Sequence, residues 1–176
     1  MRSHLNYIGG EIDEQLPAPG DGKRSRHPDR DQSAEHRLLR GVEVPRPRLV
    51  AAFGTGELPA GLEMIGEMSE ALSNRYGAKL ERITCNLYRD GRDSVAWHGD
   101  RIARNLPTAT VAILSLGEPR AFRIRSKGGG RSIGWSAGHG DLIVMGGSCQ
   151  RTHDHSIPKV AKAGERIAVM FRHNYH

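Results

Sequence analysis

The stretch ATVAILSLGEPRAFRIR, residues 109–125, decides the fold class of this chain of 176 residues. It contains two short runs of mostly apolar residues on either side of a Gly-Glu-Pro turn, the pattern of two consecutive strands. Similar runs recur at 82–88, 131–135, 141–147 and 166–172, and SKGGG (126–130) is typical of a hairpin loop. No βαβ rhythm joins these runs. We therefore predict a mainly β domain with a flanking helix (α+β), built as a β-sandwich or a jelly-roll barrel.

The flanking helix is predicted at 58–77, LPAGLEMIGEMSEALSNRYG. Pro59 suits the first turn of a helix and Gly77 suits its C-terminal cap. Residues at helical spacing form one stripe of this segment: Leu62, Ile65, Ser69, Leu72 and Tyr76.

The segment 1–40 differs from the rest of the chain in composition. It is polar, rich in turn-forming residues, and carries equal numbers of basic and acidic side chains, so the formal net charge of +6 falls on 41–176. Such a segment buries too little apolar surface to offset its ordering entropy. We predict a disordered or reduced N-terminal segment at 1–40 and one folded domain at 41–176, which the chain enters through an extended edge segment at 41–54.

The composition also bounds the setting in which the protein works. The chain has two cysteines, Cys85 and Cys149, and neither a signal peptide nor an apolar stretch of membrane-spanning length. We therefore expect free thiols and a soluble, cytoplasmic protein, without a membrane partner and monomeric. The positive net charge favours polyanionic partners such as nucleic acid, although charge alone does so weakly.

A His-x-Asp pair, His98 and Asp100, lies in the extended stretch AWHGD. Alternate residues of an extended segment point the same way, so this pair matches two ligands of the two-histidine, one-carboxylate site that holds non-haem Fe(II). RTHDHSIPK offers His153 or His155 as the third ligand, and their spacing does not choose between them.

Two further pairs of polar residues have the spacing of strand neighbours. Arg166 and Arg172, in RIAVMFR, are an even number of residues apart and share one face, where their guanidinium groups would bind a dicarboxylate. Asn86 and Tyr88 share a face of the segment TCNLYRDG and are able to donate hydrogen bonds to carboxylate oxygens.

Four stretches together resemble the AlkB family of Fe(II)/2-oxoglutarate-dependent dioxygenases, in particular its bacterial nucleic-acid-repair branch. The resemblance covers roughly 42–173 and implies a double-stranded β-helix (jelly-roll) barrel. The four stretches are CNLYRDGRDSVAWHGD (85–100), ATVAILSLGEPRAFRIR (109–125), GHGDLIVMGGSCQRTHDHSIPK (138–159) and GERIAVMFR (164–172).

The resemblance also implies roles for individual residues. His98, Asp100 and His155 match the iron ligands, which leaves His153 as a wall residue. Cosubstrate contacts are implied for Asn86, Tyr88, Arg166 and Arg172, and substrate contacts for Trp97 and Arg125.

The implied activity is oxidative demethylation of N-alkylated bases in DNA or RNA, with Fe(II), 2-oxoglutarate and O₂, releasing formaldehyde. A reacting base must leave its stack, so single-stranded DNA is the favoured partner. Two departures from the family pattern bear on this: Ala168 replaces an Asn that is frequent there, and the segment before residue 41 is poor in the aromatic residues of a substrate lid. The alternatives are a 2-oxoglutarate oxygenase with another substrate and a catalytically impaired nucleic-acid-binding protein.

Overall fold

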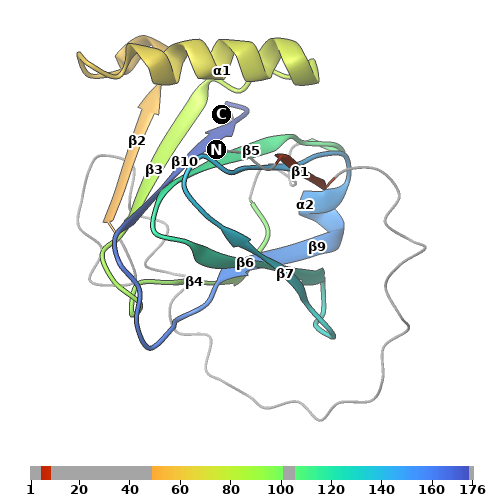
Figure 1. Cartoon of the computed structure of the whole chain (residues 1–176). Helices are drawn as coiled ribbons and strands as arrows, with labels where there is room; N and C mark the ends of the chain where they lie inside the picture. Colours follow the sequence, from red (N-terminus) through yellow and green to blue (C-terminus); the bar gives the residue numbers. More distant parts are fainter. Residues whose placement is uncertain (1–4, 9–48, 101–105, 175–176) are drawn as a thin grey trace.

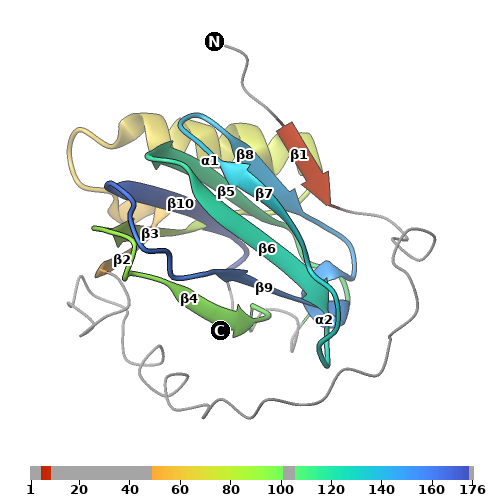
Figure 2. The same ribbon diagram turned by 60° about the horizontal axis from the view of Figure 1, so that its bottom comes forward.

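Two β-sheets face each other in the computed structural model, which describes residues 5–8, 49–100 and 106–174 (Figures 1 and 2). The larger sheet has the strand order β1-β8-β5-β10-β3-β2 and the smaller one β4-β9-β6-β7. All pairings between these strands are antiparallel except that of β1 with β8. Two facing sheets of this kind confirm the predicted mainly β fold of the jelly-roll class.

The strands of the larger sheet, in spatial order, are β1 (Leu5–Ile8), β8 (Leu142–Met145), β5 (Val111–Gly117), β10 (Arg166–Arg172), β3 (Arg82–Tyr88) and β2 (Leu49–Gly54). Those of the smaller sheet are β4 (Val95–His98), β9 (His153–Ile157), β6 (Arg120–Ser126) and β7 (Ile133–Ala137). The helical elements are η2 (Thr55–Glu57), α1 (Glu63–Tyr76) and α2 (Cys149–Thr152).

Side chains along the strands of the larger sheet alternate between its two faces and contribute to a hydrophobic core on each side. On β5, Val111 and Ile113 face the smaller sheet and join the core between the sheets. Ala112, between them, faces the opposite way and packs in a second core with Leu72 of α1 and Phe171 of β10. Apolar residues therefore lie on both faces of the larger sheet, which explains the unbroken hydrophobic run at the start of β5.

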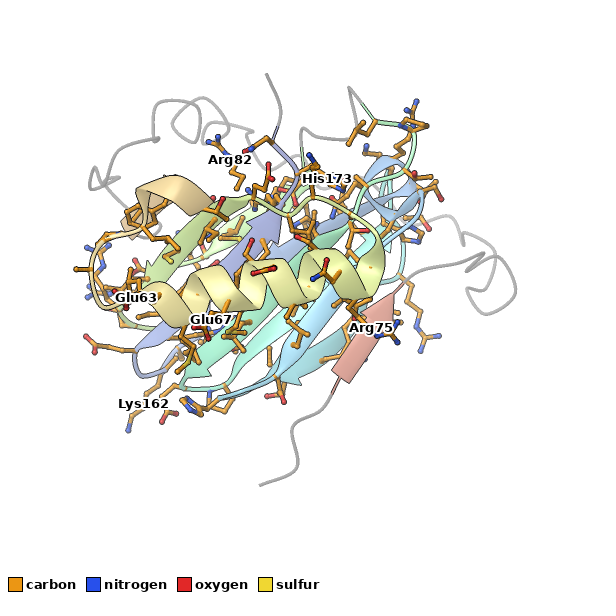
Figure 3. The ribbon with its side chains drawn as sticks, turned by 90° about the horizontal axis from the view of Figure 1, so that it is seen from above. Glu63, Glu67, Arg75, Arg82, Lys162 and His173 are labelled. Carbon is orange, nitrogen blue, oxygen red and sulfur yellow. The ribbon has the colours of Figure 1, made fainter. Side chains whose placement is uncertain are left out.

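Helix α1 covers the outer face of the larger sheet (Figures 1 and 3). Gly77 ends it in the left-handed conformation with φ 60°, as its predicted capping role requires. The predicted start is wrong: the helix begins at Glu63, and Pro59 lies before it in the turn after η2. On the buried side of the helix, the Ser69 hydroxyl donates a hydrogen bond of 2.7 Å to the Leu80 carbonyl oxygen.

The N-terminal expectation is only partly within the described residues. Residues 9–48 and 1–4 lie outside them, and so does the greater part of the predicted segment 1–40. Within it, Leu5–Ile8 form β1, which pairs in parallel with β8 at the edge of the larger sheet. The extended segment expected at 41–54 continues as β2 from Leu49, at the opposite edge.

The SKGGG loop joins β6 to β7, as the sequence predicts. Gly128, Gly129 and Gly130 have φ values of 92°, 110° and 97°, in the left-handed region that favours glycine. Among the described residues, no helix is long and apolar enough to cross a membrane.

Candidate metal and cosubstrate site

His98 and His155 meet across the smaller sheet. They are cross-strand partners at the β4–β9 pairing, and their ring centroids are 4.3 Å apart. Asp100 lies two residues beyond His98, and one ligand atom from each of the three residues lies within 4.8 Å of the other two. The structure therefore brings together the three residues that the resemblance implies as iron ligands.

The two histidines have a form suited to binding a metal. Nδ1 of His98 is 2.8 Å from the Ala96 carbonyl oxygen, a contact in which Nδ1 carries the proton and Nε2 keeps its lone pair. Burial and the neighbouring His98 lower the pKa of His155 to about 3, against an opposing effect of Asp100. His155 is therefore neutral at physiological pH, and its ring packs on Phe122 at 5.6 Å between centroids.

The carboxylate of Asp100 is held in its charged form. Burial raises the pKa of this carboxyl, but Arg172, His155 and His98 together lower it below its ordinary value. Nη2 of Arg172 is 3.2 Å from Oδ1, while Oδ2 is buried without a hydrogen-bond partner. One carboxylate oxygen is thus left for a metal ion.

Asp100 reaches this position from a loop, because β4 ends at His98. Its backbone N–H donates a hydrogen bond of 2.9 Å to Oε1 of Gln150, a buried residue of α2. Gly99 fits between the strand and α2 because a Cβ there would lie 3.0 Å from the Gln150 carbonyl oxygen. The prediction that an extended backbone alone orients the His-x-Asp pair is therefore incomplete.

A pocket that opens to solvent adjoins the histidines, with about 420 Å³ of empty space including its open mouth. His98 and His155 line it together with Arg166 and Arg172, so β10 does turn both arginines to the same face. Arg166 is 1% exposed; its Nε donates a hydrogen bond of 2.9 Å to Ser115, and its Nη1 and Nη2 have no partner. Two buried unpaired donors of one guanidinium match the two oxygens of a carboxylate.

Asn86 and Tyr88, the predicted pair on β3, also line the pocket. The Tyr88 ring lies 5.3 Å from the Arg166 guanidinium carbon. Oδ1 of Asn86 is buried without a partner. Ala168, which departs from the family pattern, lines the same pocket and faces Asn86 across the sheet.

Trp97 and Arg125 are not among the residues that line this pocket. The structure instead brings them to each other, with the Arg125 guanidinium carbon 4.2 Å from the Trp97 ring centroid. Both side chains are half-buried. His153 lies outside the metal cluster as well, and its Nδ1 is 2.8 Å from the Thr152 hydroxyl.

Three residues of this site were not predicted: Ser115, Phe122 and Gln150. Ser115 shares the inward face of β5 with Val111 and Ile113. A single hydroxyl residue among inward-facing apolar residues was the feature of the sequence that could have marked it as a site residue. Phe122 reads as an ordinary core residue. Gln150 carries no sequence signal, because its role depends on where α2 docks.

The site defines a class of protein. A largely buried His-Asp-His set with open lone pairs, in which His98 is half-buried, fits a divalent iron ion, and unpaired guanidinium donors beside it fit an anionic cosubstrate. These features, inside a jelly-roll barrel, define a mononuclear iron oxygenase.

Comparison with known proteins identifies the family. The model of the 2OG-Fe(II) oxygenase superfamily matches residues 21–172, and the chain belongs to this family. It is 31% identical over 156 residues to human alpha-ketoglutarate-dependent dioxygenase alkB homolog 3, covering 76% of this chain and 54% of that protein. It is 32% identical over 120 residues to Arabidopsis thaliana DNA oxidative demethylase ALKBH2, covering 54% of this chain and 38% of that one.

A solved structure is similar as well. A Pseudomonas putida prolyl-4-hydroxylase matches with a TM-score of 0.49 and 16% identity over 73% of each chain.

The chain is an AlkB-like member of the family, as the four motifs predicted. It spans about half the length of the alkB homolog 3 proteins that it matches. Its cofactors are Fe(II) and 2-oxoglutarate, with O₂ as cosubstrate.

Proposed function

We propose that this protein oxidatively demethylates N-alkylated bases in DNA or RNA and so takes part in the repair of alkylation damage. The observation that carries the proposal is the His98, Asp100 and His155 cluster beside a pocket that also contains Arg166. The overall reaction converts an N-methyl group, 2-oxoglutarate and O₂ into the free N–H, formaldehyde, succinate and CO₂.

Each side chain of the site has a defined part in this proposal. His98, Asp100 and His155 hold Fe(II), which when bound supplies the activation of O₂ for oxidation of a methyl C–H bond. Arg166 binds the distal carboxylate of 2-oxoglutarate through its two unpaired terminal nitrogens. Arg172 holds Asp100 and lies at the metal side of the cosubstrate.

Tyr88 and Asn86 complete the cosubstrate pocket. Tyr88 is 2% exposed and packs against Arg166, so its phenol is able to share the same carboxylate. The side-chain amide of Asn86, whose oxygen is unpaired, lines the same pocket two residues along β3 from Tyr88. Because Tyr88 and Arg166 are almost fully buried, this end of the pocket is shielded from water.

The charges around the smaller sheet favour a nucleic-acid substrate. On this sheet, its β6–β7 loop and α2, the charged side chains that are exposed or half-buried are mainly basic, and Asp154 is the acidic one among the described residues. The basic residues, which we name the basic face, are Arg123, Arg125, Lys127, Arg131 and Arg151. Basic side chains near a catalytic site attract phosphates and release their counterions.

Trp97 and Arg125 give this face an aromatic element. A base flanking the target is able to stack on the indole or on the guanidinium plane, since every base offers a π-face. Because neither residue lines the pocket, we assign them to the strand beside the target base and not to the target itself. The proposal includes a preference for single strands, a cytoplasmic location and a monomeric state, the last testable by analytical ultracentrifugation.

The test is formaldehyde release from single-stranded DNA that contains 1-methyladenine or 3-methylcytosine, with Fe(II), ascorbate and 2-oxoglutarate. An unmethylated oligonucleotide of the same sequence and the His98→Ala variant are the controls. Methyl-dependent release that is lost in His98→Ala supports the proposal. The same oligonucleotide as RNA and as a duplex ranks the substrates. Consumption of 2-oxoglutarate without release of formaldehyde would show that the protein is an active oxygenase whose substrate is not a methylated base.

A further inference from the structure

Arg120, at the start of β6, ties two separate parts of the chain together. It is 2% exposed and has no ion-pair partner within 4 Å among the described residues; its terminal nitrogens donate to three backbone carbonyl oxygens instead. Nη1 donates to Asp90 at 3.0 Å, while Nη2 donates to Asp93 at 2.8 Å and to Pro158 at 2.9 Å. Asp90 and Asp93 follow β3, and Pro158 follows β9.

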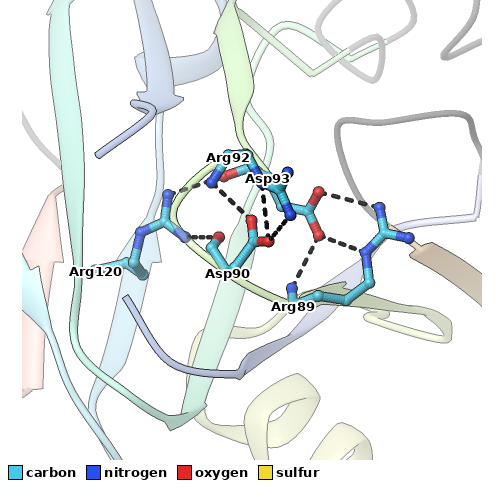
Figure 4. Close-up of polar contacts among 5 residues, drawn as sticks. All are labelled: Arg89, Asp90, Arg92, Asp93 and Arg120. Carbon is cyan, nitrogen blue, oxygen red and sulfur yellow. Dashed lines mark hydrogen bonds and ion pairs between the residues drawn. The ribbon is translucent and has the colours of Figure 1, made fainter. Parts of the chain in front are cut away.

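The loop that Arg120 grips has a fixed shape of its own (Figure 4). Arg89 donates from Nε and Nη2 to the two carboxylate oxygens of the buried Asp93, at 2.8 and 3.1 Å. Arg92 pairs with the Asp90 carboxylate at 2.7 Å. Both aspartates thus present their backbone carbonyls to Arg120 while their carboxylates are held by other arginines.

The same loop also packs on the segment after β9. The Val160 N–H donates a hydrogen bond of 2.9 Å to the Gly91 carbonyl oxygen. A Cβ at Gly91 would lie 2.3 Å from the Val160 carbonyl oxygen, so the contact requires glycine. Arg120 therefore reinforces a close contact between the ends of two strands that both carry site residues.

Both strands carry site residues close to these ends. Tyr88 is the last residue of β3, directly before the loop, and His155 lies two residues before the end of β9 at Ile157. The Arg120 guanidinium carbon lies 5.7 Å from the Tyr88 ring centroid, and that of Arg166 lies 5.3 Å from it. The Tyr88 ring is thus packed against two guanidinium groups, of which Arg166 lines the pocket and Arg120 does not.

We infer that Arg120 is a positioning residue for 2-oxoglutarate, which acts by holding Tyr88 and the ends of β3 and β9 in the geometry that Arg166 needs. This inference rests on the proposed function, because it assigns the carboxylate of the cosubstrate to Arg166 and Tyr88. Arg120 itself does not line the pocket and reaches it through Tyr88, so we expect its effect to fall on cosubstrate affinity.

The test measures 2-oxoglutarate binding to the Mn(II)-loaded protein by titration calorimetry in wild type and Arg120→Lys. A lysine keeps the charge but lacks the planar fork that reaches three carbonyls. We expect the dissociation constant for 2-oxoglutarate to rise at least roughly 5-fold, from the loss of one or two such hydrogen bonds. Affinity for Mn(II) and for the methylated oligonucleotide should stay within about 2-fold, and kcat at saturating 2-oxoglutarate should be largely retained.

Arg92→Lys is the matched control, since Arg92 is an exposed arginine of the same loop that pairs only with Asp90 in the contacts described above. Its 2-oxoglutarate affinity should equal that of wild type. Gly91→Ala serves as a second variant if Arg120→Lys fails to fold, because it displaces the same loop without changing Arg120. It should show the same selective loss.

The outcomes separate the inference from the proposed function. If the wild-type protein binds no 2-oxoglutarate, the proposed function fails. If wild type binds it and both Arg120→Lys and Gly91→Ala bind it equally well, only the role of Arg120 is overturned. A parallel loss of metal, cosubstrate and oligonucleotide affinity would also overturn it, because that pattern indicates a general structural role.

Discussion

The His98 and His155 rings face each other across the β4–β9 pair, with centroids 4.3 Å apart. Replacement of either residue by Ala should abolish Fe(II)-dependent turnover. Even changes outside a ligand set cost roughly 10–100-fold in metal affinity, so loss of a ligand should cost more. The measurement is Mn(II) or Co(II) affinity together with formaldehyde release.

His153→Ala is the matched control for this prediction. His153 lies two residues from His155 on the same strand but outside the metal cluster. Its variant should keep most of the metal affinity and activity. A larger loss in His153→Ala than in His155→Ala would move the third ligand to His153.

Arg166 should determine the requirement for 2-oxoglutarate. Arg166→Gln removes the two unpaired buried donors, and truncation of one partner of a buried charged pair costs about 2–5 kcal/mol. We therefore expect the KM for 2-oxoglutarate to rise roughly 30-fold or more. Ser115→Ala leaves the guanidinium in place and removes the acceptor of Arg166 Nε together with the bond to the Ala137 carbonyl oxygen, so it should give a smaller increase. An unchanged KM in Arg166→Gln would refute the carboxylate role.

Gln150 should act on metal affinity through Asp100. Gln150→Leu keeps the volume of the side chain but removes the oxygen that accepts the Asp100 N–H. We expect a loss of roughly 10–100-fold in Mn(II) affinity, as for other residues that orient a ligand. Gln150→Glu retains an acceptor oxygen and should lose less. Equal metal affinity in Gln150→Leu and wild type would show that Asp100 is oriented without Gln150.

The Trp97 and Arg125 pair should affect nucleic-acid affinity alone. Arg125→Ala should reduce the slope of log affinity against log salt by about one, the value for one phosphate contact. Trp97→Ala should weaken single-strand binding by about 1–3 kcal/mol if a base stacks on it. Binding of 2-oxoglutarate should be unchanged in both variants.

Arg75→Ala provides the control for this measurement. Arg75 lies on α1, on the opposite side of the larger sheet from the basic face (Figure 3). Its removal also deletes one positive charge but should leave the salt slope unchanged. If Arg75→Ala and Arg125→Ala have the same effect, the attraction comes from net charge and not from the basic face.

His173 should make the stability of the fold depend on pH. Its Nε2 accepts a hydrogen bond of 3.2 Å from the Thr110 N–H, and burial lowers its pKa below the ordinary value of 6.5. Below that value the unfolded chain binds a proton that the folded chain does not bind until lower pH. The contribution to stability is therefore complete above pH 6.5 and is lost as the pH falls.

The measurement is the free energy of unfolding from urea denaturation between pH 7.5 and 5 in wild type and His173→Gln. The amide oxygen of Gln accepts the same hydrogen bond without titrating. The decline in stability should be less steep in His173→Gln, by the uptake of at most one proton. Parallel curves would show that His173 has the same pKa in the folded and unfolded chain.

The sequence predicted some strands with exact bounds. β3 and β10 begin and end where the patterns RITCNLY and RIAVMFR do. In both strands the functional side chains alternate with apolar ones. The period-two alternation of the sequence therefore predicts which residues face the pocket. The predicted start of α1 was wrong because Pro59 and Leu62 are compatible both with the first turn of a helix and with a non-helical turn before it.

The sequence by itself determined the mainly β fold, the shared face of Arg166 and Arg172, and the chemistry of a His-x-Asp pair. These features are local, since strand periodicity needs only neighbouring residues. Residue spacing left His153 and His155 open, and only the tertiary structure places His155 beside that pair, with Gln150 bonded to the Asp100 backbone. Those contacts join residues far apart in the chain, and the register between strands depends on turn geometry and on packing across the whole core.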